Sequence, residues 1–266
     1  MFKIKLFLGI GDIILTKSYL LHILKTQPIE VGFHDAIIKS YISNPKIVDF
    51  SYEFLKTVYH EHGFSISKSP TLHENPLNWS DLRNRKVPES IIDLSSVLAP
   101  YEVQYSNYIC INTKIRDLHH DKFLKLLPFF KTVLNELSLK YNIILMGEKE
   151  VEKTIEYNKL PNLVYSMYPY IKDIKCIDLT VDKLGNTESN LEKLKYDASL
   201  MRSAVCTINV GAGGNLSISS SVGKSINYME NVVYFNHNFL DFKDNVYKNC
   251  SVYTNFDKFL QGLRNL

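Results

Sequence analysis

The sequence predicts an α/β fold of two domains that face a cleft, each with a parallel sheet covered by helices. Apolar runs of strand length alternate with segments whose apolar residues recur at helical spacing, which is the pattern of parallel sheets. Two glycine turns, at residues 9–12 and 211–215, each lie between a predicted strand and a predicted helix. Prolines interrupt the pattern between residues 65 and 100, so this mostly irregular stretch is expected to connect the two domains.

The first domain is predicted to hold strands at residues 2–9 and 29–33 and helices at 12–25 and 47–62. Residues 2–9 (FKIKLFLG) are a largely apolar run, typical of a strand covered on both faces. Both helical segments carry apolar residues at intervals of three and four, which predicts one buried face on each.

The second domain contains more elements. Its predicted strands are 108–112, 142–146, 163–165, 176–179, 204–210, 225–229 and 232–235, and its predicted helices are 119–140, 149–157, 189–202, 215–222 and 256–263. A kink is expected near Pro128, because a proline inside a helix removes a backbone hydrogen bond. Strands alternating with helices again indicate a parallel sheet.

Composition narrows the class of protein. The 266 residues are 45% apolar with a net charge of +3, which is typical of a globular protein and gives no reason to expect a nucleic-acid partner. The cysteines form no CxxC pair, and those at 110, 176 and 206 lie in apolar runs, so we expect buried free thiols in a reducing compartment. With no predicted signal peptide and no apolar run of about 18 residues, we expect a cytoplasmic protein, with peripheral membrane association compatible.

Asp12 stands at the start of the first predicted helix, directly after the Gly9–Gly11 turn. The carboxyl edge of a parallel sheet is where open α/β folds bind ligands. A carboxylate there is suited to act as a general base on an acceptor hydroxyl. A plain structural role is also open, because the helix dipole favours an acid at this end.

The turn at 211–215 resembles a phosphate site, since backbone N–H groups at a glycine-rich helix start bind anions. Gly213, Gly214 and Asn215 would supply amides, and Ser217 with the serines at 219–221 would add hydroxyl donors nearby. The alternative is a tight turn that needs positive φ.

Two further strand ends carry polar residues that are expected at the same edge. Lys114 and Arg116 follow the strand 108–112 in a loop, where two cations suit a diphosphate, although solvated surface charges are an equal interpretation. Gly147 and Glu148 follow the strand 142–146, so Glu148 would face the same cleft unless it is only the first acid of a helix.

Three other sequence patterns lack residues that the corresponding functional motifs require. The sequence Gly223-Lys224-Ser225 lacks the first glycine of a P-loop, whose place is taken by Ile218. A dinucleotide fingerprint at Gly9 and Gly11 would need a third glycine where Ile14 stands, although Glu30 is roughly placed as its ribose acid. The histidines at 60, 62, 119 and 120 have no supporting acid or cysteine cluster, so no metal site is expected.

Taken together, these positions resemble the two-domain GT-B glycosyltransferases, and in particular the heptosyltransferase family, glycosyltransferase family 9. That family opens with a motif of the form S-x-G-D-[VIL]-[LV]-x-[TA], which residues 11–16 (GDIILT) match. Its strand with a basic loop is similar to residues 108–117, and its strand with a following glycine and acid is similar to 143–148. Its late phosphate-binding segment is similar to 212–219, where Ala212 replaces an acid and Ser217 replaces a histidine.

This resemblance implies three parts to the chain. A reduced N-terminal Rossmann-like domain at 1–103 would bind the acceptor, and a C-terminal domain at 104–255 would bind the nucleotide-sugar. A terminal helix at 256–266 would pack back on the N-terminal domain. Closure of the two domains would exclude water.

The implied activity is transfer of a sugar from a nucleotide-sugar to a hydroxyl of a glycan or glycolipid acceptor, with Asp12 as general base. The residues expected to hold the donor are Gly11, Lys114, Arg116, Gly213, Gly214, Asn215 and Ser217 at its phosphates, and Gly147 and Glu148 at its nucleotide. No metal and no cofactor is expected. Two alternatives stay open: an NAD(P)-dependent oxidoreductase or epimerase with Glu30 on the cofactor, and a non-catalytic nucleotide-sugar-binding relative.

Overall fold

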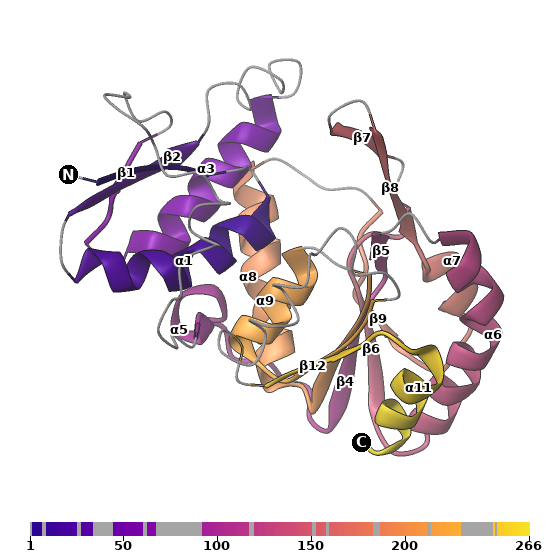
Figure 1. The fold of residues 1–266 in the computed structure, drawn as a ribbon. Helices are drawn as coiled ribbons and strands as arrows, with labels where there is room; N and C mark the ends of the chain where they lie inside the picture. The colour runs from indigo at the N-terminus through magenta and orange to yellow at the C-terminus, as the bar shows by residue number, and fades with distance from the viewer. Residues whose placement is uncertain are drawn as a thin grey trace.

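The chain folds into two parallel sheets with a layer of helices between them (Figure 1). The computed structural model describes residues 2–6, 9–25, 28–33, 45–60, 63–67, 92–116, 120–150, 153–157, 160–182, 187–211, 214–229, 247 and 249–266. An α/β fold with parallel sheets is therefore confirmed.

The N-terminal sheet is small and parallel, in the order β1-β2-β3. Its strands are β1 (Phe2–Leu6), β2 (Ile29–Phe33) and β3 (Ser65–Ile66), and its helices are α1 (Ile10–Leu24), α3 (Pro45–Tyr59) and the short α5 (Ser95–Leu98). Both β1 and β2 lie within the predicted ranges. The side chains of Ile4 and Leu6 in β1 and of Ile29, Val31 and Phe33 in β2 are buried, as expected for a sheet that helices cover.

The C-terminal sheet has six strands in the order β12-β11-β10-β4-β6-β9, and all of its pairings are parallel. Its strands are β4 (Tyr108–Asn112), β6 (Asn142–Met146), β9 (Ile177–Asp178), β10 (Cys206–Val210), β11 (Ser225–Tyr228) and β12 (Cys250–Tyr253). The strands β4 and β6 match their predicted ranges in full. Residues of β4 are buried on both faces, as the continuous apolar run predicted.

Helices cover both faces of this sheet, because alternate strand residues point to two separate apolar cores. One face carries α8 (Thr187–Ser203) and α9 (Gly214–Val222), and the other carries α6 (His120–Leu137), α7 (Tyr168–Ile171) and α11 (Phe256–Arg264). Helix α6 continues through Pro128. The predicted strand at 232–235 lies outside the described residues.

The helical layer joins the two sheets. Helix α1 packs on α9 and α3 packs on α8, and one apolar core runs from β1 and β2 through these helices to β4 and β6. The segment before β4 is hydrogen-bonded to α8 in the same layer. Arg202 of α8 donates to the carbonyls of Ala99 and Tyr101, and the Tyr101 N–H donates to Ser199 of α8 at 3.1 Å. The expected domain boundary at 103/104 lies in this segment before β4.

A third sheet was not predicted. Residues 149–157 were expected to form a helix, but β7 (Lys153–Tyr157) pairs antiparallel with β8 (Leu160–Ser166). Strand β8 in turn pairs with β5 (Lys114–Arg116), which was expected to be a loop. Threonine, isoleucine and tyrosine in β7 favour a strand, and the partner that decides the matter comes later in the chain.

The terminal helix was expected to pack on the N-terminal domain, and this is wrong. Helix α11 lies beside α6 on the C-terminal sheet, as Figure 1 shows at the yellow end of the chain. Phe259 is fully buried there, stacked on Phe130 at a ring distance of 5.8 Å, and Arg264 pairs with Glu136 at 2.9 Å. The apolar face of α11 is therefore buried against the C-terminal sheet, the sheet that precedes it in the chain.

The cysteines were expected to be buried free thiols. All four thiols are free; Cys110, Cys206 and Cys250 are buried, and Cys176 is partly exposed.

Among the helices in the described part of the chain, none combines the length and the apolar character needed to cross a membrane.

Candidate functional site

The first turn of α1 follows directly on the carboxyl end of β1. The Ile13 N–H donates to the Gly9 carbonyl at 3.0 Å, so the helix begins there. The N–H groups of Ile10, Gly11 and Asp12 precede the first helical hydrogen bond and are available to a ligand. The backbone of Asp12 is thus in the first turn, as predicted, while its side chain lies outside what the structure describes.

Helix α9 begins in contact with α1. A Cβ atom added to Gly214, the first residue of α9, would lie 2.9 Å from the Cβ of Ile10 and 3.1 Å from its Cγ2. Only a glycine allows this approach, so the chain's two glycine turns, about 200 residues apart, meet at their helix starts. The positive ends of two helix dipoles therefore converge.

The rest of the second glycine turn is partly described. Gly211 has φ +79°, which favours glycine, and its N–H donates to Tyr228 at 2.8 Å. Gly213, an expected phosphate-binding residue, lies outside the described residues together with Ala212. Asn215 follows Gly214 in the first turn and is partly exposed.

The serines of α9 were expected to offer hydroxyls to a ligand, and for three of them this is wrong. Ser219 and Ser221 donate to carbonyls of their own helix at 3.1 and 2.8 Å, and Ser220 bonds to Ser225 of β11 at 2.7 Å. Ser217 is 3% exposed. Helix α9 is buried between the sheet and α1, so small residues that satisfy themselves internally suit it.

The basic residues after β4 belong to a strand. Lys114 and Arg116 lie in β5, opposite Ser166 and Val164 of β8. The side chain of Ile115 is buried in the core beneath α6, so alternation directs Lys114 to the opposite side of β5. The Arg116 side chain lies outside the described part, and Lys114 is partly exposed with partners of its own.

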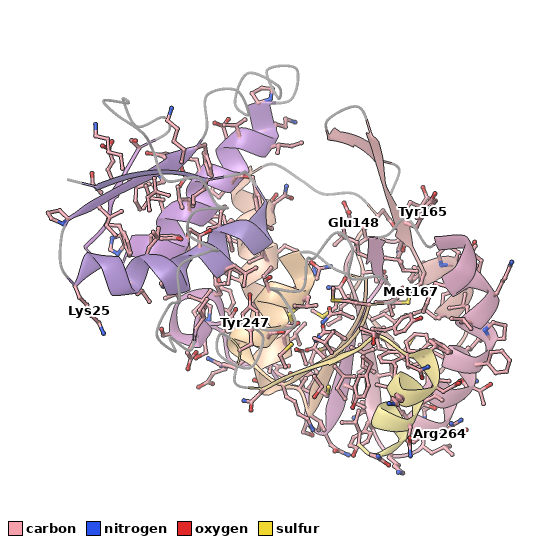
Figure 2. The ribbon with its side chains drawn as sticks, viewed as in Figure 1. Lys25, Glu148, Tyr165, Met167, Tyr247 and Arg264 are labelled. Carbon is pink, nitrogen blue, oxygen red and sulfur yellow. The ribbon has the colours of Figure 1, made fainter. Side chains whose placement is uncertain are left out.

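Gly147 and Glu148 extend β6 beyond its last strand residue. Gly147 has φ +104°, and a Cβ atom there would lie 2.9 Å from the Thr113 Oγ1 and 3.1 Å from the Asn112 Oδ1. This requires glycine on both conformational and steric grounds. Glu148 is partly exposed at the end of the sheet, where Figure 2 labels it.

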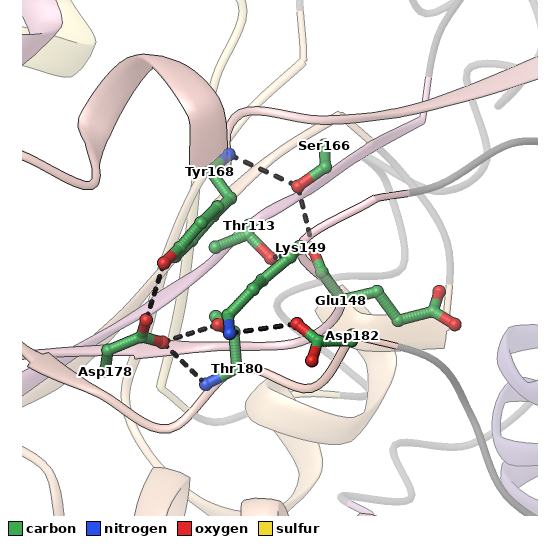
Figure 3. Close-up of polar contacts among 8 residues, drawn as sticks. All are labelled: Thr113, Glu148, Lys149, Ser166, Tyr168, Asp178, Thr180 and Asp182. Atoms are coloured by element: carbon green, nitrogen blue, oxygen red, sulfur yellow. Dashed lines mark hydrogen bonds and ion pairs between the residues drawn. The ribbon is translucent and has the colours of Figure 1, made fainter.

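A network of polar side chains surrounds residues 147–149, which extend β6 (Figure 3). No sequence pattern predicted this network. The Tyr168 hydroxyl donates to Asp178 at 2.7 Å, the Thr180 N–H donates to Asp178 at 3.0 Å, and Lys149 pairs with Asp182 at 2.9 Å. Partial burial opposes ionisation of Asp178, but hydrogen bonds from Thr180 and Tyr168 outweigh it and lower the pKa of that carboxyl. The Asp182 carboxylate raises the pKa of Lys149. The residues of this network come from α7, from the end of β9 and the segment after it, and from the extension of β6.

The described residues form neither a metal site nor the ribose site of the oxidoreductase alternative. No cluster of three or more His, Cys, Asp or Glu side chains that could hold a metal occurs in the part of the chain that the structure describes. Glu30, the ribose acid of the oxidoreductase alternative, pairs with Lys3 at 3.4 Å. Both lie at the second residue of their strands, toward the edge of the sheet opposite to the start of α1.

Comparisons with known proteins give distant structural likenesses. No family model matches the sequence, and no curated protein matches it. Among solved structures, the chain is similar to the iron-containing dodecameric glycosyltransferase TibC from enterotoxigenic E. coli, with 14% identity over 85% of this chain and 56% of that one and a TM-score of 0.43. A structure of the heptosyltransferase TibC in complex with ADP-D-β-D-heptose matches with 14% identity over 81% and 53% and a TM-score of 0.39.

A third similar structure is a glycosyl transferase family 9 protein from Veillonella parvula, with 11% identity over 99% of this chain and 88% of that one and a TM-score of 0.46. The chain spans about half the length of the TibC chains. All three structures are described as glycosyltransferases.

Proposed function

We propose that the chain is a glycosyltransferase that moves a sugar from a nucleotide-sugar to a hydroxyl of a glycan or glycolipid acceptor. The observation that carries this proposal is the contact between Ile10 and Gly214. It joins the start of a helix that bears a carboxylate residue to the start of a glycine-led helix suited to a diphosphate. Glycosyl transfer from a nucleotide-sugar needs both groups within one substrate's reach.

In this proposal the parts act as follows. Asp12 takes the proton of the acceptor hydroxyl, whose oxygen forms a bond to the anomeric carbon of the sugar. The bond from that carbon to the diphosphate breaks, and the electron pair leaves with the nucleoside diphosphate. The amides of Gly213, Gly214 and Asn215 meet the developing negative charge, with Gly11 and the Ser217 hydroxyl as further donor-binding groups.

Other groups complete the donor site. The cations of Lys114 and Arg116 would add to the stabilisation of the diphosphate, and Glu148, beside Gly147, would receive the nucleotide. The proposed reaction uses no resident metal and no cofactor, so transfer should persist in the presence of a chelator. The two-domain GT-B arrangement, with the acceptor on the N-terminal side, belongs to the same proposal.

The test is the variant Asp12→Asn, which removes the base but keeps a residue suited to a helix start. It should bind nucleoside diphosphates as the wild type does and lose transfer by about 100-fold or more. Binding is followed by the rise in melting temperature with UDP, GDP, ADP, CMP, TDP or NAD(P), with and without Mg²⁺.

The matched control is Asp257→Asn, because Asp257 occupies the first turn of α11 and is exposed far along the chain. It loses the same favourable interaction with a helix dipole and should keep full transfer. Transfer that survives in Asp12→Asn would show that Asp12 is not the base. Stabilisation by NAD(P) alone would replace the proposal with the oxidoreductase.

A further inference from the structure

We propose that Asn209 is a positioning residue, whose buried side-chain amide holds helix α9 at a fixed rotation on the C-terminal sheet. The N–H groups in the first turn of α9 are thereby aimed at the donor diphosphate. This inference rests on the proposed function and deepens it. The hold is provided by a buried amide network, formed by Asn209, Asn227, Ser219, Ser220 and Ser225, and its loss should weaken binding of the diphosphate but not of the nucleoside.

Helix α9 begins where the C-terminal sheet changes its direction of growth. Among the strands of this sheet, β4, β6 and β9 follow one another along the chain into one half, and β10, β11 and β12 fill the other half. The crevice between the carboxyl ends of β4 and β10 is therefore the topological switch point, where open α/β sheets bind ligands. Because α9 follows β10, the direction of its first-turn N–H groups decides how well an anion binds there.

The amide nitrogen of Asn209 ties β10 to α9. It donates to the Ser219 Oγ of α9 at 2.9 Å and to the Asn227 Oδ1 of β11 at 2.8 Å. Asn227 lies opposite Asn209 in the pairing of the two strands, and it donates in turn to the Ser251 carbonyl of β12 at 3.2 Å. The position of Ser219 is thus fixed against three adjacent strands.

A second hydrogen bond joins the same helix to the same sheet. The Ser220 Oγ lies 2.7 Å from the Ser225 Oγ of β11, and Asn227 donates to that Ser225 hydroxyl at 3.1 Å. Two bonds from consecutive helix residues to neighbouring strands fix the rotation of α9 about its own axis. The first-turn N–H groups belong to the backbone of this helix and turn with it, so the amide network sets their direction.

The apolar contacts of α9 do not give the same control. Leu216, Ile218 and Val222 are buried in the core that α9 shares with α1 and α8. Burial of apolar side chains is a non-directional interaction, whereas a hydrogen bond weakens steeply away from its preferred angle. The rotation of α9 is therefore set by Ser219 and Ser220, which bond to the sheet.

The amide network contains a polar atom that stability alone does not explain. Asn209 is 2% exposed, and its Oδ1 is buried with no hydrogen-bond partner among the described residues. A buried acceptor without a partner destabilises a folded protein. Asparagine is the shortest side chain with a nitrogen that donates two hydrogen bonds. A requirement for both bonds therefore accounts for Asn209 in spite of the destabilising oxygen.

The experiment measures Kd by calorimetry for a nucleoside diphosphate and for its nucleoside, with ADP against adenosine, UDP against uridine and GDP against guanosine. The ratio of the two affinities isolates the contribution of the diphosphate. Ser219→Ala and Asn209→Leu should lower this ratio about threefold to tenfold, the size of one hydrogen bond, by weakening the diphosphate alone. Since Asn209→Leu already removes the bond to Ser219, adding Ser219→Ala to it should lower the ratio no further.

Each variant has a matched control in the same element. The Ser221 hydroxyl donates to the Ile218 carbonyl at 2.8 Å, and the Ser219 hydroxyl also bonds within α9, but among the described residues the Ser221 hydroxyl has no bond to the sheet. Thr207 lies two residues before Asn209 on β10, is fully buried, and has an Oγ1 without a hydrogen-bond partner in the described part of the chain. Ser221→Ala and Thr207→Val should both keep the wild-type ratio.

The outcomes separate the inference from the proposed function. An unchanged ratio in Ser219→Ala, equal weakening of diphosphate and nucleoside, or an equal fall of the ratio in Ser221→Ala would overturn the positioning role and leave the proposed function standing. Ser219→Ala removes a single oxygen atom, so it decides the question even where Asn209→Leu fails to fold. A wild type that binds no nucleoside diphosphate, or binds it no better than the nucleoside, would overturn both.

Discussion

At the residue scale, local signals found the residues that sit at element ends. A glycine before or after an acid at the end of an apolar run was enough to single out Asp12, Gly147 and Glu148. The same signal could not find Thr113 or Ser166, because a threonine or serine near a strand end is common. What distinguishes them is that each donates a hydrogen bond to the Glu148 carbonyl, which is distant in sequence.

The glycine at 147 gives a residue-scale prediction with an internal control. Gly147→Ala combines positive φ with a close approach to Thr113, so it should lower the free energy of unfolding by about 2–5 kcal/mol. Gly63 has φ +71° but nothing within 4 Å of the added Cβ, so Gly63→Ala should cost only about 1 kcal/mol. Urea denaturation measures both, and equal losses would show that the steric term is absent.

A second prediction concerns pH. Asp197 of α8 pairs with Lys193, but burial dominates and raises the pKa of its carboxyl above the ordinary 3.8. Ionisation of Asp197 therefore lowers the stability of the folded protein. The neutral carboxyl makes its full contribution to stability below pH 3.8, and this contribution is lost as the pH rises through the pKa of the folded state. Asp197→Asn should be more stable than the wild type at pH 7, with the difference vanishing below about pH 4.

The control for this prediction has the opposite sign. The Lys131 ammonium, which hydrogen-bonds Asp173, lowers the pKa of that carboxyl. Its stabilising contribution is present above pH 3.8 and is lost as the pH falls through the folded pKa. Asp173→Asn should therefore be slightly less stable than the wild type at pH 7 and equal to it in strong acid. Thermal unfolding across pH 3–8 compares the two, and pH curves of the same sign would contradict the assignment.

At the element scale, period and length predicted most of the parallel strands and long helices, but not the surroundings of α9. Its serines read as exposed donors, whereas α9 is covered by the C-terminal sheet on one side and α1 on the other. The strand β7 was missed for a related reason. Its residues contain both strand and helix formers, and the choice is made by pairing with β8.

The contact between α1 and α9 gives the element-scale prediction. Gly214→Ala would force α9 away from Ile10 and should both lower the free energy of unfolding by about 1–3 kcal/mol and weaken nucleoside diphosphate binding. Gly223→Ala is the control: Gly223 directly follows the last residue of α9, and a Cβ atom added there would lie 2.6 Å from the carbonyl oxygen of Met201 in α8. It should destabilise the protein but leave Kd unchanged; a similar loss of binding in both variants would mean that only stability matters.

At the scale of the whole molecule, the two parallel sheets are joined by one apolar core. The segment that leads into β4 is also hydrogen-bonded to α8 through Ala99 and Tyr101. The expectation of two domains that close on each other came from the resemblance and from the proline-rich stretch, neither of which reveals that α3 packs on α8. The packing of α11 on α6 was also beyond reach, because an amphipathic helix shows that it needs an apolar partner and not which one.

The shared core predicts cooperative unfolding. The calorimetric and van 't Hoff enthalpies should agree, with one transition for the whole chain. Arg202→Ala removes the hydrogen bonds to Ala99 and Tyr101 and should lower the free energy of unfolding by about 1–3 kcal/mol without splitting the transition. Two separated transitions in either protein would show that the N-terminal and C-terminal sheets are independent folding units.

The sequence by itself determined the alternation of strands and helices, the buried character of the central strands and the glycine turns at which helices α1 and α9 begin. These are local properties, since spacing of apolar residues and the conformational freedom of glycine act within a few residues. Only the tertiary structure decided that Gly214 meets Ile10, that Thr113 and Ser166 share the Glu148 carbonyl, and that α11 lies beside α6. Such contacts join segments far apart in sequence, and their energy depends on packing that no single segment encodes.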